Sequence, residues 1–335
     1  MMRRLVVALS LLATPAAAND GFMGLPAGGL TLQKSEAISM LEEDLFLSLD
    51  EVRVDYVFRN VSAAPVTAQI GFPMPGLPVA VNFDAAETGY DMSDVKDLEL
   101  LKFQTRVEGK PVTSRPVVRA FVFPEFKEGD RQDRFRFTKA TDITAELAGA
   151  GVPLTFDAAA IKAAYARLPA AKKADWHKRG IYTKEADYEV PGWFLSTIFV
   201  REQTFAPGQN VRVQHRYKPY PAGFVMVSNH FAYDRQLAID TCVDKPTGRA
   251  IARVLKPQNG GIGYVIDYVV TTANTWKGPI GRFRMTVDKG NAKNIVSFCG
   301  DGVKKTGPTT FTVERRNYRP EREIKILVVK PPEAG

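Results

Sequence analysis

The sequence predicts a mainly β protein, with two antiparallel β-sandwich domains and a small α-helical insertion between them. Apolar side chains recur at every second position in many short segments, which are rich in β-branched and aromatic residues. That period is typical of strands with one buried face. Turn residues separate these segments at short intervals, as in sandwiches. One central stretch changes to helical spacing, and it is the predicted insertion.

Residues 1–18 have the three parts of a secretory signal peptide. Arg3 and Arg4 precede an apolar run over residues 5–12, and Ala16, Ala17 and Ala18 follow. A basic start, an apolar centre and small residues at the end are the expected order. The run is shorter than the roughly 20 residues that cross a bilayer. We therefore predict cleavage after Ala18 and a soluble exported protein; a buried N-terminal helix is the alternative.

The first predicted β-sandwich covers residues 19–139. The strands are expected at residues 37–41, 45–49, 52–58, 66–72, 100–107 and 116–123. Between residues 52 and 58, apolar and charged side chains alternate strictly. Pro73 is expected to end the strand at residues 66–72, because proline cannot donate a hydrogen bond within a sheet.

The helical insertion is expected over residues 140–186. Asp142 and Asp157 stand where the side chain of a helix N-cap would be, and Pro169 suits the first turn of a third helix. Ile161 and Tyr165 have the spacing of one helix face, and Gly180 ends the helical pattern. The insertion therefore separates two strand-rich regions.

The second predicted β-sandwich covers residues 187–335. Segments 195–205 and 211–217 flank the sequence Pro-Gly-Gln-Asn at 207–210, which is a hairpin signal. Further strands are expected at residues 231–239, 249–255, 264–271, 283–287, 294–299, 310–315 and 324–329. Cys242 and Cys299 are the two cysteines of the chain, and in an oxidising compartment they predict one disulfide.

The charge of the chain is moderately basic and scattered. Lys and Arg number 45 against 37 Asp and Glu, a formal net charge of +8. The densest basic cluster, residues 131–139, interleaves with Phe135 and Phe137. That pattern occurs in proteins that bind single-stranded nucleic acid, but a half-buried strand gives it as well. We expect no nucleic acid partner, and contact with an anionic lipid surface stays open.

No catalytic or metal-binding motif is found in the sequence. It lacks the H-E-x-x-H and G-x-S-x-G patterns, and neither cysteine has further metal ligands at a suitable spacing. Of the histidines, His177 is expected in a solvated helix end, His215 on a buried strand face with a hydrogen bond, and His230 in a polar turn. The sequence therefore predicts no cofactor, no metal and no assigned catalytic residue.

Aromatic side chains beside turns are the candidate ligand-binding residues. Trp193, Tyr217, Tyr220 and Trp276 all lie close to proline or glycine. Exposed aromatic rings stack on sugars or on proline-containing peptides. The alternative is that these rings fill the ends of the sandwiches.

A series of short motifs runs in order along most of the chain after residue 18. It includes Asn19-Asp20, Ile38-Ser39-Met40, Val52-Arg53-Val54, Phe72-Pro73-Met74-Pro75, His215-Arg216-Tyr217 and Trp276-Lys277-Gly278-Pro279. In these motifs the chain resembles a family of exported bacterial proteins catalogued as a domain of unknown function, family four-four-two-four. The resemblance implies a Gram-negative periplasm, and it supplies no catalytic or binding residues.

The function expected from the sequence is a non-enzymatic binding or envelope-accessory module of the periplasm. Its partner would be an envelope protein, a polysaccharide or a peptide. The alternative is a hydrolase of an envelope polymer, whose site between the two β domains would use His215 or His230 with distant carboxylates. The oligomeric state is left open.

Overall fold

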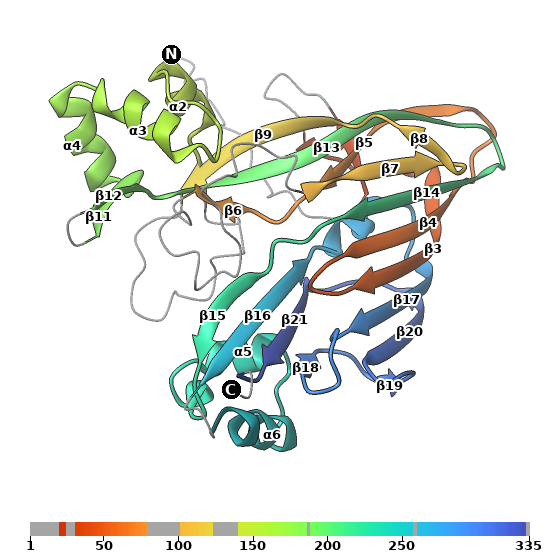
Figure 1. Cartoon of the computed structure of the whole chain (residues 1–335). Helices are drawn as coiled ribbons and strands as arrows, with labels where there is room; N and C mark the ends of the chain where they lie inside the picture. Colours follow the sequence, from red (N-terminus) through yellow and green to blue (C-terminus); the bar gives the residue numbers. More distant parts are fainter. Residues whose placement is uncertain are drawn as a thin grey trace, which may run out of the picture.

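Strands dominate the structure, as the alternating pattern predicts (Figure 1). The protein is described by a computed structural model, which covers residues 20–24, 31–79, 101–122, 140–185, 188–256 and 260–332. The predicted signal peptide and the basic cluster at residues 131–139 lie outside the described residues. The mainly β class is confirmed.

Sheet A is built around the long strand β13. Its strands follow the order β10 (Thr141–Asp142), β9 (Arg115–Val122), β13 (Trp193–Phe205), β5 (Val66–Pro73), β1 (Gly21–Gly24) and β2 (Thr31–Leu32), with β6 (Leu77–Pro78) also paired to β13. The pairs are antiparallel, and β13 receives β9 on one side and β5 on the other. A strand of the second region is thus enclosed by strands of the first.

Sheet B likewise combines strands from both predicted β regions. Its order is β19 (Lys304–Lys305), β20 (Thr310–Tyr318), β17 (Ile280–Asp288), β3 (Ile38–Leu47), β4 (Val52–Asn60), β14 (Asn210–Tyr217), β7 (Gln104–Val107) and β8 (Lys110–Val112). β17 runs parallel to β3, and β14 runs antiparallel to both β4 and β7. Early and late segments of the chain alternate across this sheet.

The last part of the chain forms sheet D, with two helices beside it. Sheet D has the order β15 (Ala222–Met226), β16 (Gly261–Tyr268), β21 (Ile324–Lys330) and β18 (Ile295–Phe298). The helices are α5 (Arg235–Asp240) and α6 (Lys245–Leu255), and short 3-10 turns lie at His230–Ala232 (η4) and Thr271–Thr275 (η6). A small hairpin, sheet C, consists of β11 (Tyr182–Glu185) and β12 (Tyr188–Pro191).

The strand pairing corrects the expectation of two separate sandwiches divided into residues 19–139 and 187–335. Strands β13 and β14 follow residue 187, yet they pair with β5, β9, β4 and β7. Sequence periodicity shows which face of a strand is buried, but it does not show which distant strand lies next to it. The two predicted β regions therefore share sheets A and B.

The main core lies on one face of sheet B. Along β4 the side chains of Val52, Val54, Tyr56 and Phe58 are buried, and those between them are more exposed. Sheet A packs on this face where the Phe72 ring lies 4.6 Å from the His215 ring. Sheet D packs on it where the hydroxyls of Tyr56 and Tyr268 lie 3.0 Å apart. A smaller core fills the other face of sheet D, below α6.

The helical insertion is present, at one end of the molecule (Figure 1). Its helices are α2 (Thr144–Gly149), α3 (Ala158–Ala166) and α4 (Ala170–Lys178). Asp157 caps α3, as predicted, by accepting from the Ala160 N–H at 3.0 Å. Asp142 instead lies in β10, and Ile143 stands at the N-cap of α2.

Two predicted strands are helices in the structure. The expected strands at 231–239 and 249–255 are replaced by η4, α5 and α6. Asp234 and Asp244 cap these helices by accepting from the N–H groups of Leu237 and Thr247. Such caps satisfy N–H groups that the first helical turn leaves free. The predicted disulfide is confirmed: Cys242, after α5, is bonded to Cys299, after β18.

Candidate functional site

His215, one of the histidines of the hydrolase hypothesis, lies deep in the core on β14. Its ring centroid lies 4.6 Å from that of Phe72 and 5.2 Å from that of Phe103. Its Nε2 lies 3.0 Å from Asp20 Oδ1, and its Nδ1 lies 3.0 Å from the hydroxyl of Thr105. The prediction of a buried histidine with a hydrogen bond is confirmed.

Asp20 is the centre of this polar network. The guanidinium of Arg201 donates to both carboxylate oxygens, at 3.2 and 2.8 Å, and the Trp276 indole N–H donates to the backbone carbonyl of Asp20 at 2.6 Å. Burial alone would raise the pKa of Asp20, but the charge and hydrogen bonds of Arg201 and His215 hold it well below its usual range. Asp20 is therefore an ionised carboxylate with no exposed surface.

The direction of the hydrogen bonds follows from this charge. A carboxylate only accepts, so His215 donates to Asp20 through Nε2–H. Burial lowers the pKa of His215 despite the attraction of Asp20, so the ring is neutral and its Nδ1 accepts from the Thr105 hydroxyl. Thr105 in turn accepts from the Ser114 hydroxyl at 3.0 Å.

The network contains the residue types of a catalytic relay, but a substrate cannot reach it. His215 is 1% exposed, Thr105 4% and Asp20 0%, and aromatic rings cover the imidazole. A general base has to reach a proton of its substrate, and an enclosed ring does not. The arrangement instead fastens β1, which follows Asp20, to β13 and β14 of the two large sheets.

The other two histidines lie apart from this network. His177, in the last turn of α4, has its Nε2 2.9 Å from the Tyr165 hydroxyl and 3.1 Å from Glu189 Oε1. His230 lies in η4, where its Nδ1 is 3.2 Å from the Tyr233 hydroxyl and burial lowers its pKa. The three histidines therefore belong to separate local clusters.

The candidate aromatic residues do not form an exposed groove. Trp193, Tyr217 and Trp276 are 1%, 3% and 3% exposed, and Tyr220 is partly buried against the main core. Trp276 packs on Phe58 with 4.7 Å between ring centroids, and Trp193 packs near Trp176 and Tyr182. The expectation of exposed rings is thus corrected for three of the four, because they fill the interior beside the turns.

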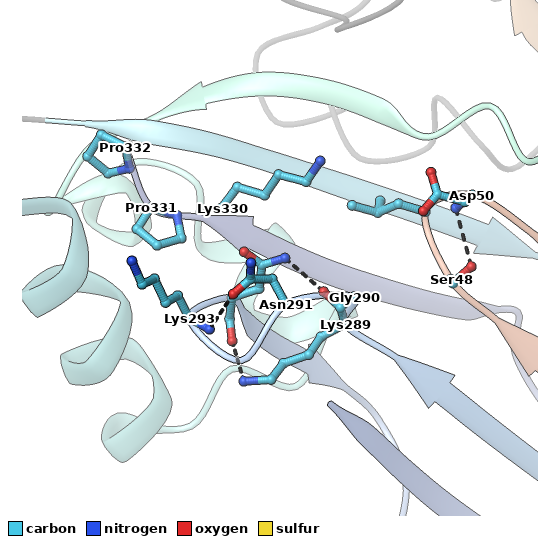
Figure 2. A pocket seen from close by; sticks show the side chains of 11 residues that line it. Ser48, Asp50, Lys289, Gly290, Asn291, Lys293, Lys330, Pro331 and Pro332 are labelled. Carbon is cyan, nitrogen blue, oxygen red and sulfur yellow. Dashed lines mark hydrogen bonds between the residues drawn. The ribbon is translucent and has the colours of Figure 1, made fainter. Parts of the chain in front are cut away.

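A cleft of about 650 Å³ lies between three segments that are distant in sequence. One wall is the β3–β4 turn with Ser48 and Asp50, another is the β17–β18 loop at residues 289–294, and the third is the end of β21 with Lys330 (Figure 2). Its volume falls in the range of about 300–1,000 Å³ that small-molecule sites have. This cleft is the candidate functional site.

The cleft is lined by more positive than negative charge. Lys289, Lys293 and Lys330 line it, and Asp50 is the one carboxylate among the described residues that do. The Nζ of Lys330 lies 4.9 Å from the centroid of the Tyr264 ring. Within the described part of the chain, neither Lys293 nor Lys330 has a carboxylate oxygen within 4.0 Å. Two ammonium groups are therefore available to an anion.

The walls of the cleft are held by their own hydrogen bonds. Lys289 turns back into its loop, where its Nζ donates to the carbonyls of Ala292 and Asn294 at 2.7 and 2.6 Å; burial lowers its pKa, and so does the charge of Lys305. The Asn294 amide returns a hydrogen bond to the Lys289 carbonyl at 2.8 Å. Opposite, the Ser48 hydroxyl accepts from the Glu51 N–H at 3.0 Å. The site is thus largely formed before a ligand arrives.

Sequence reasoning missed this cleft. The segment at 289–294, Lys-Gly-Asn-Ala-Lys-Asn, and the sequence Lys-Pro-Pro at 330–332 are visible in the sequence, but each looks like an ordinary polar turn or strand end. They meet because β17 pairs with β3 and β18 pairs with β21. Only this long-range pairing converts the separate lysines into one site.

The described residues contain neither a group of metal ligands nor a membrane-spanning helix. No group of three or more His, Cys, Asp or Glu among them is placed to hold a metal ion. No helix of the described segments is long and apolar enough to cross a membrane.

Comparison with known proteins identifies a family, and solved structures with a distantly similar fold are found as well. The sequence pattern of a family described as a domain of unknown function, DUF4424, matches residues 18–327. No curated protein matches the chain. A crystal structure from Legionella pneumophila, described as a "putative nutrient binding protein", is 11% identical over 93% of this chain and 70% of its own, with a TM-score of 0.43. So low a TM-score leaves the function to be argued from the chain's own residues.

Proposed function

Because the chain belongs to the DUF4424 family, whose function is unknown, we propose from its own cleft that it is a non-enzymatic periplasmic binding module for a small anionic ligand. The observation that carries this proposal is the pair of lysines, Lys293 and Lys330, which line the cleft and have no carboxylate partner among the residues that the structure describes.

Electrostatics favours an anion at this place. Two unit charges about 4 Å apart near a protein surface attract each other by roughly 4 kcal/mol before desolvation and salt screening reduce the gain. An ammonium group is a compact charge that binds phosphate or carboxylate without demanding one geometry. The fixed walls reduce the ordering cost of binding.

The binding module is favoured over the hydrolase by the state of the histidines. His215 is enclosed, and His230 is largely buried with its Nδ1 near Tyr233. Neither lines the cleft. The cleft offers charge and amide groups but no histidine, so it is suited to holding a ligand.

The periplasmic location rests on residues 1–18 and fits the Cys242–Cys299 disulfide, since such bonds persist in oxidising compartments. We expect the expressed protein in the periplasmic fraction, beginning at Asn19. Recovery in the cytoplasm alone, with residues 1–18 intact, would contradict the location.

The binding site is tested with methyl phosphate as the probe. We expect NMR amide shifts at Lys293, Asn291 and Lys330 as the probe is titrated into the mature protein. In the double variant Lys293→Gln/Lys330→Gln the affinity should fall at least about tenfold, because both cationic partners are lost.

Lys162→Gln is the matched control. Lys162 is an exposed lysine on α3 in the helical insertion, at the other end of the molecule (Figure 1). This variant should bind methyl phosphate as the wild type does. Absence of shifts in the cleft at saturating probe, or equal affinity of the double variant, would overturn the proposed site.

A further inference from the structure

We infer that the ligand of this cleft is an amphiphilic anion, whose acidic head lies at Lys330 and Lys293 and whose apolar chain lies along one face of sheet D. This inference rests on the proposed function and adds the chemical class of the ligand. It comes from the strand register next to Lys330 and from the exposure of the side chains there.

The register places three side chains in one row across sheet D. Lys330 on β21 pairs with Ile262 on β16, and Ile262 pairs with Val225 on β15. Directly paired residues of neighbouring strands point to the same face, and the strands are about 4.8 Å apart. An apolar row therefore begins at the lysine and leads to the edge of the sheet.

The same face of sheet D changes from closed to open along its length. At one end Ile266 and Tyr268 are 1% and 0% exposed, because sheet B covers them. At the other end Tyr264 and Ile262 are only partly buried and Val225 is 54% exposed. The core face thus continues as an apolar strip, formed by Tyr264, Ile262 and Val225, which lies beside the cleft and meets it at Lys330.

Charge and apolar surface meet at one point of this strip. The Nζ of Lys330 lies over the Tyr264 ring, with 4.9 Å to its centroid. A head group bound by Lys330 therefore has the strip directly beside it. The strip offers hydrocarbon and one aromatic face, so it favours an alkyl or acyl chain over the hydroxyl-rich body of a sugar phosphate.

The occupant is a single molecule in a concave site. The cleft of about 650 Å³ lies between the β3–β4 turn and the β17–β18 loop, whereas a membrane surface would need a flat or convex basic face. A phospholipid head group and a free alkyl phosphate share the same anion chemistry, and the experiment separates a monomer in the cleft from adsorption to a bilayer.

The experiment compares methyl phosphate with octyl phosphate, used below its micelle concentration, by isothermal titration of the mature protein. Each CH₂ group removed from water adds roughly a factor of four in affinity. With only part of the chain buried, octyl phosphate should bind at least about tenfold more tightly than methyl phosphate.

The variant Val225→Ser tests the strip itself. Val225 is exposed, so the substitution should leave the fold and the methyl phosphate affinity unchanged. It should reduce the advantage of octyl phosphate at least about threefold. The matched control is Val61→Ser, because Val61 is a valine of similar exposure, 44%, in the turn after β4.

The outcomes separate the two proposals. If neither phosphate binds, the binding function itself fails. Equal affinity for the two phosphates, or an equal change of the octyl phosphate affinity in Val225→Ser and Val61→Ser, would keep the anion site. Either result would contradict the inference that the ligand is amphiphilic. If the protein sediments with phosphatidylglycerol vesicles but does not bind monomeric octyl phosphate, the inference of a single amphiphilic molecule in the cleft is also wrong.

Discussion

At the scale of single residues, Asp267 is a carboxyl group whose pKa is raised by folding. It lies on β16 opposite Lys325, and its Oδ1 has no hydrogen-bond partner. Burial raises its pKa to about 6, Lys325 opposes this, and Asp240 and Glu323 add to it. In the unfolded chain the pKa of an aspartate is about 3.9. The ionised form is therefore disfavoured by folding.

We expect Asp267→Asn to stabilise the protein at pH 8. Because the folded-state pKa is raised, the wild type gains stability as pH falls from about 6 toward 4, and above pH 6 it carries the full cost of the ionised group. The rise of the Asp267 pKa from about 3.9 to about 6 corresponds to about 3 kcal/mol of free energy of unfolding. Partial exposure reduces the expected gain to on the order of 1–2 kcal/mol.

Urea unfolding at pH 8 and pH 4 measures this effect. The gain of Asp267→Asn should be present at pH 8 and nearly absent at pH 4. Glu321→Gln, at an exposed position three residues before β21, is the control that should change little at either pH. An equal gain at both pH values would show that ionisation is not its cause.

Single residues also show how much of the buried network could be predicted from the sequence. The buried, hydrogen-bonded role of His215 follows from its place on an alternating strand, and the structure agrees. Its partners Asp20 and Thr105, and Arg201 beyond them, lie on other strands, and nothing in the local pattern connects them. A buried histidine needs hydrogen-bond partners, but the sequence alone does not show which residues they are.

At the scale of elements, the disulfide is the strongest local constraint on the last third of the chain. Cys242 and Cys299 are separated by 57 positions and join the end of α5 to the end of β18. The loop contains α6, β16, η6, β17 and β18. A cross-link of this span limits the unfolded chain and so stabilises the folded one.

We expect the double variant Cys242→Ser/Cys299→Ser to lose about 4 kcal/mol in the chain-entropy description of a loop of this size. Urea unfolding of the variant and of the reduced wild type should give similar losses. Hydrogen exchange should increase first in α5, whose last carbonyls lie near Cys299. A loss below about 1 kcal/mol would contradict this stabilising role.

Elements differ in how well the sequence predicts them. The strand at Val52–Asn60 and the helix at Ala158–Ala166 follow from strict periodicity and a cap. At α5 and α6 the sequence predicts strands, because β-branched and aromatic residues near them are typical of strands. The helical signal lies in the caps at Asp234 and Asp244. The cleft could not be predicted, since its walls come from three segments whose approach depends on sheet pairing.

At the scale of the whole molecule, the interleaved sheets make the two β regions depend on each other. β13 completes sheet A between β9 and β5, and β14 completes sheet B between β4 and β7. Neither strand finds these partners within residues 187–335. The main core correspondingly contains residues from both regions.

We expect the fragment 187–335, expressed alone, to lack a cooperative unfolding transition, whereas the chain 19–335 has one. Circular dichroism against urea measures this for both. Mixing fragments 19–186 and 187–335 should restore part of the transition, because the missing strands are then supplied. A cooperative transition of fragment 187–335 on its own would contradict this mutual dependence.

The parallel pairing of β3 with β17 joins two segments that meet late in folding. β3 ends at Leu47 and β17 begins at Ile280, so 280 minus 47, or 233 positions, separate them. Pairs between segments so far apart in the sequence form slowly, so one edge of β3 stays open until β17 reaches it. An open edge of ten strand residues is a template for pairing with another chain. We therefore expect the yield of refolding to fall as the protein concentration rises, because chains whose β3 edge is still open can pair with one another.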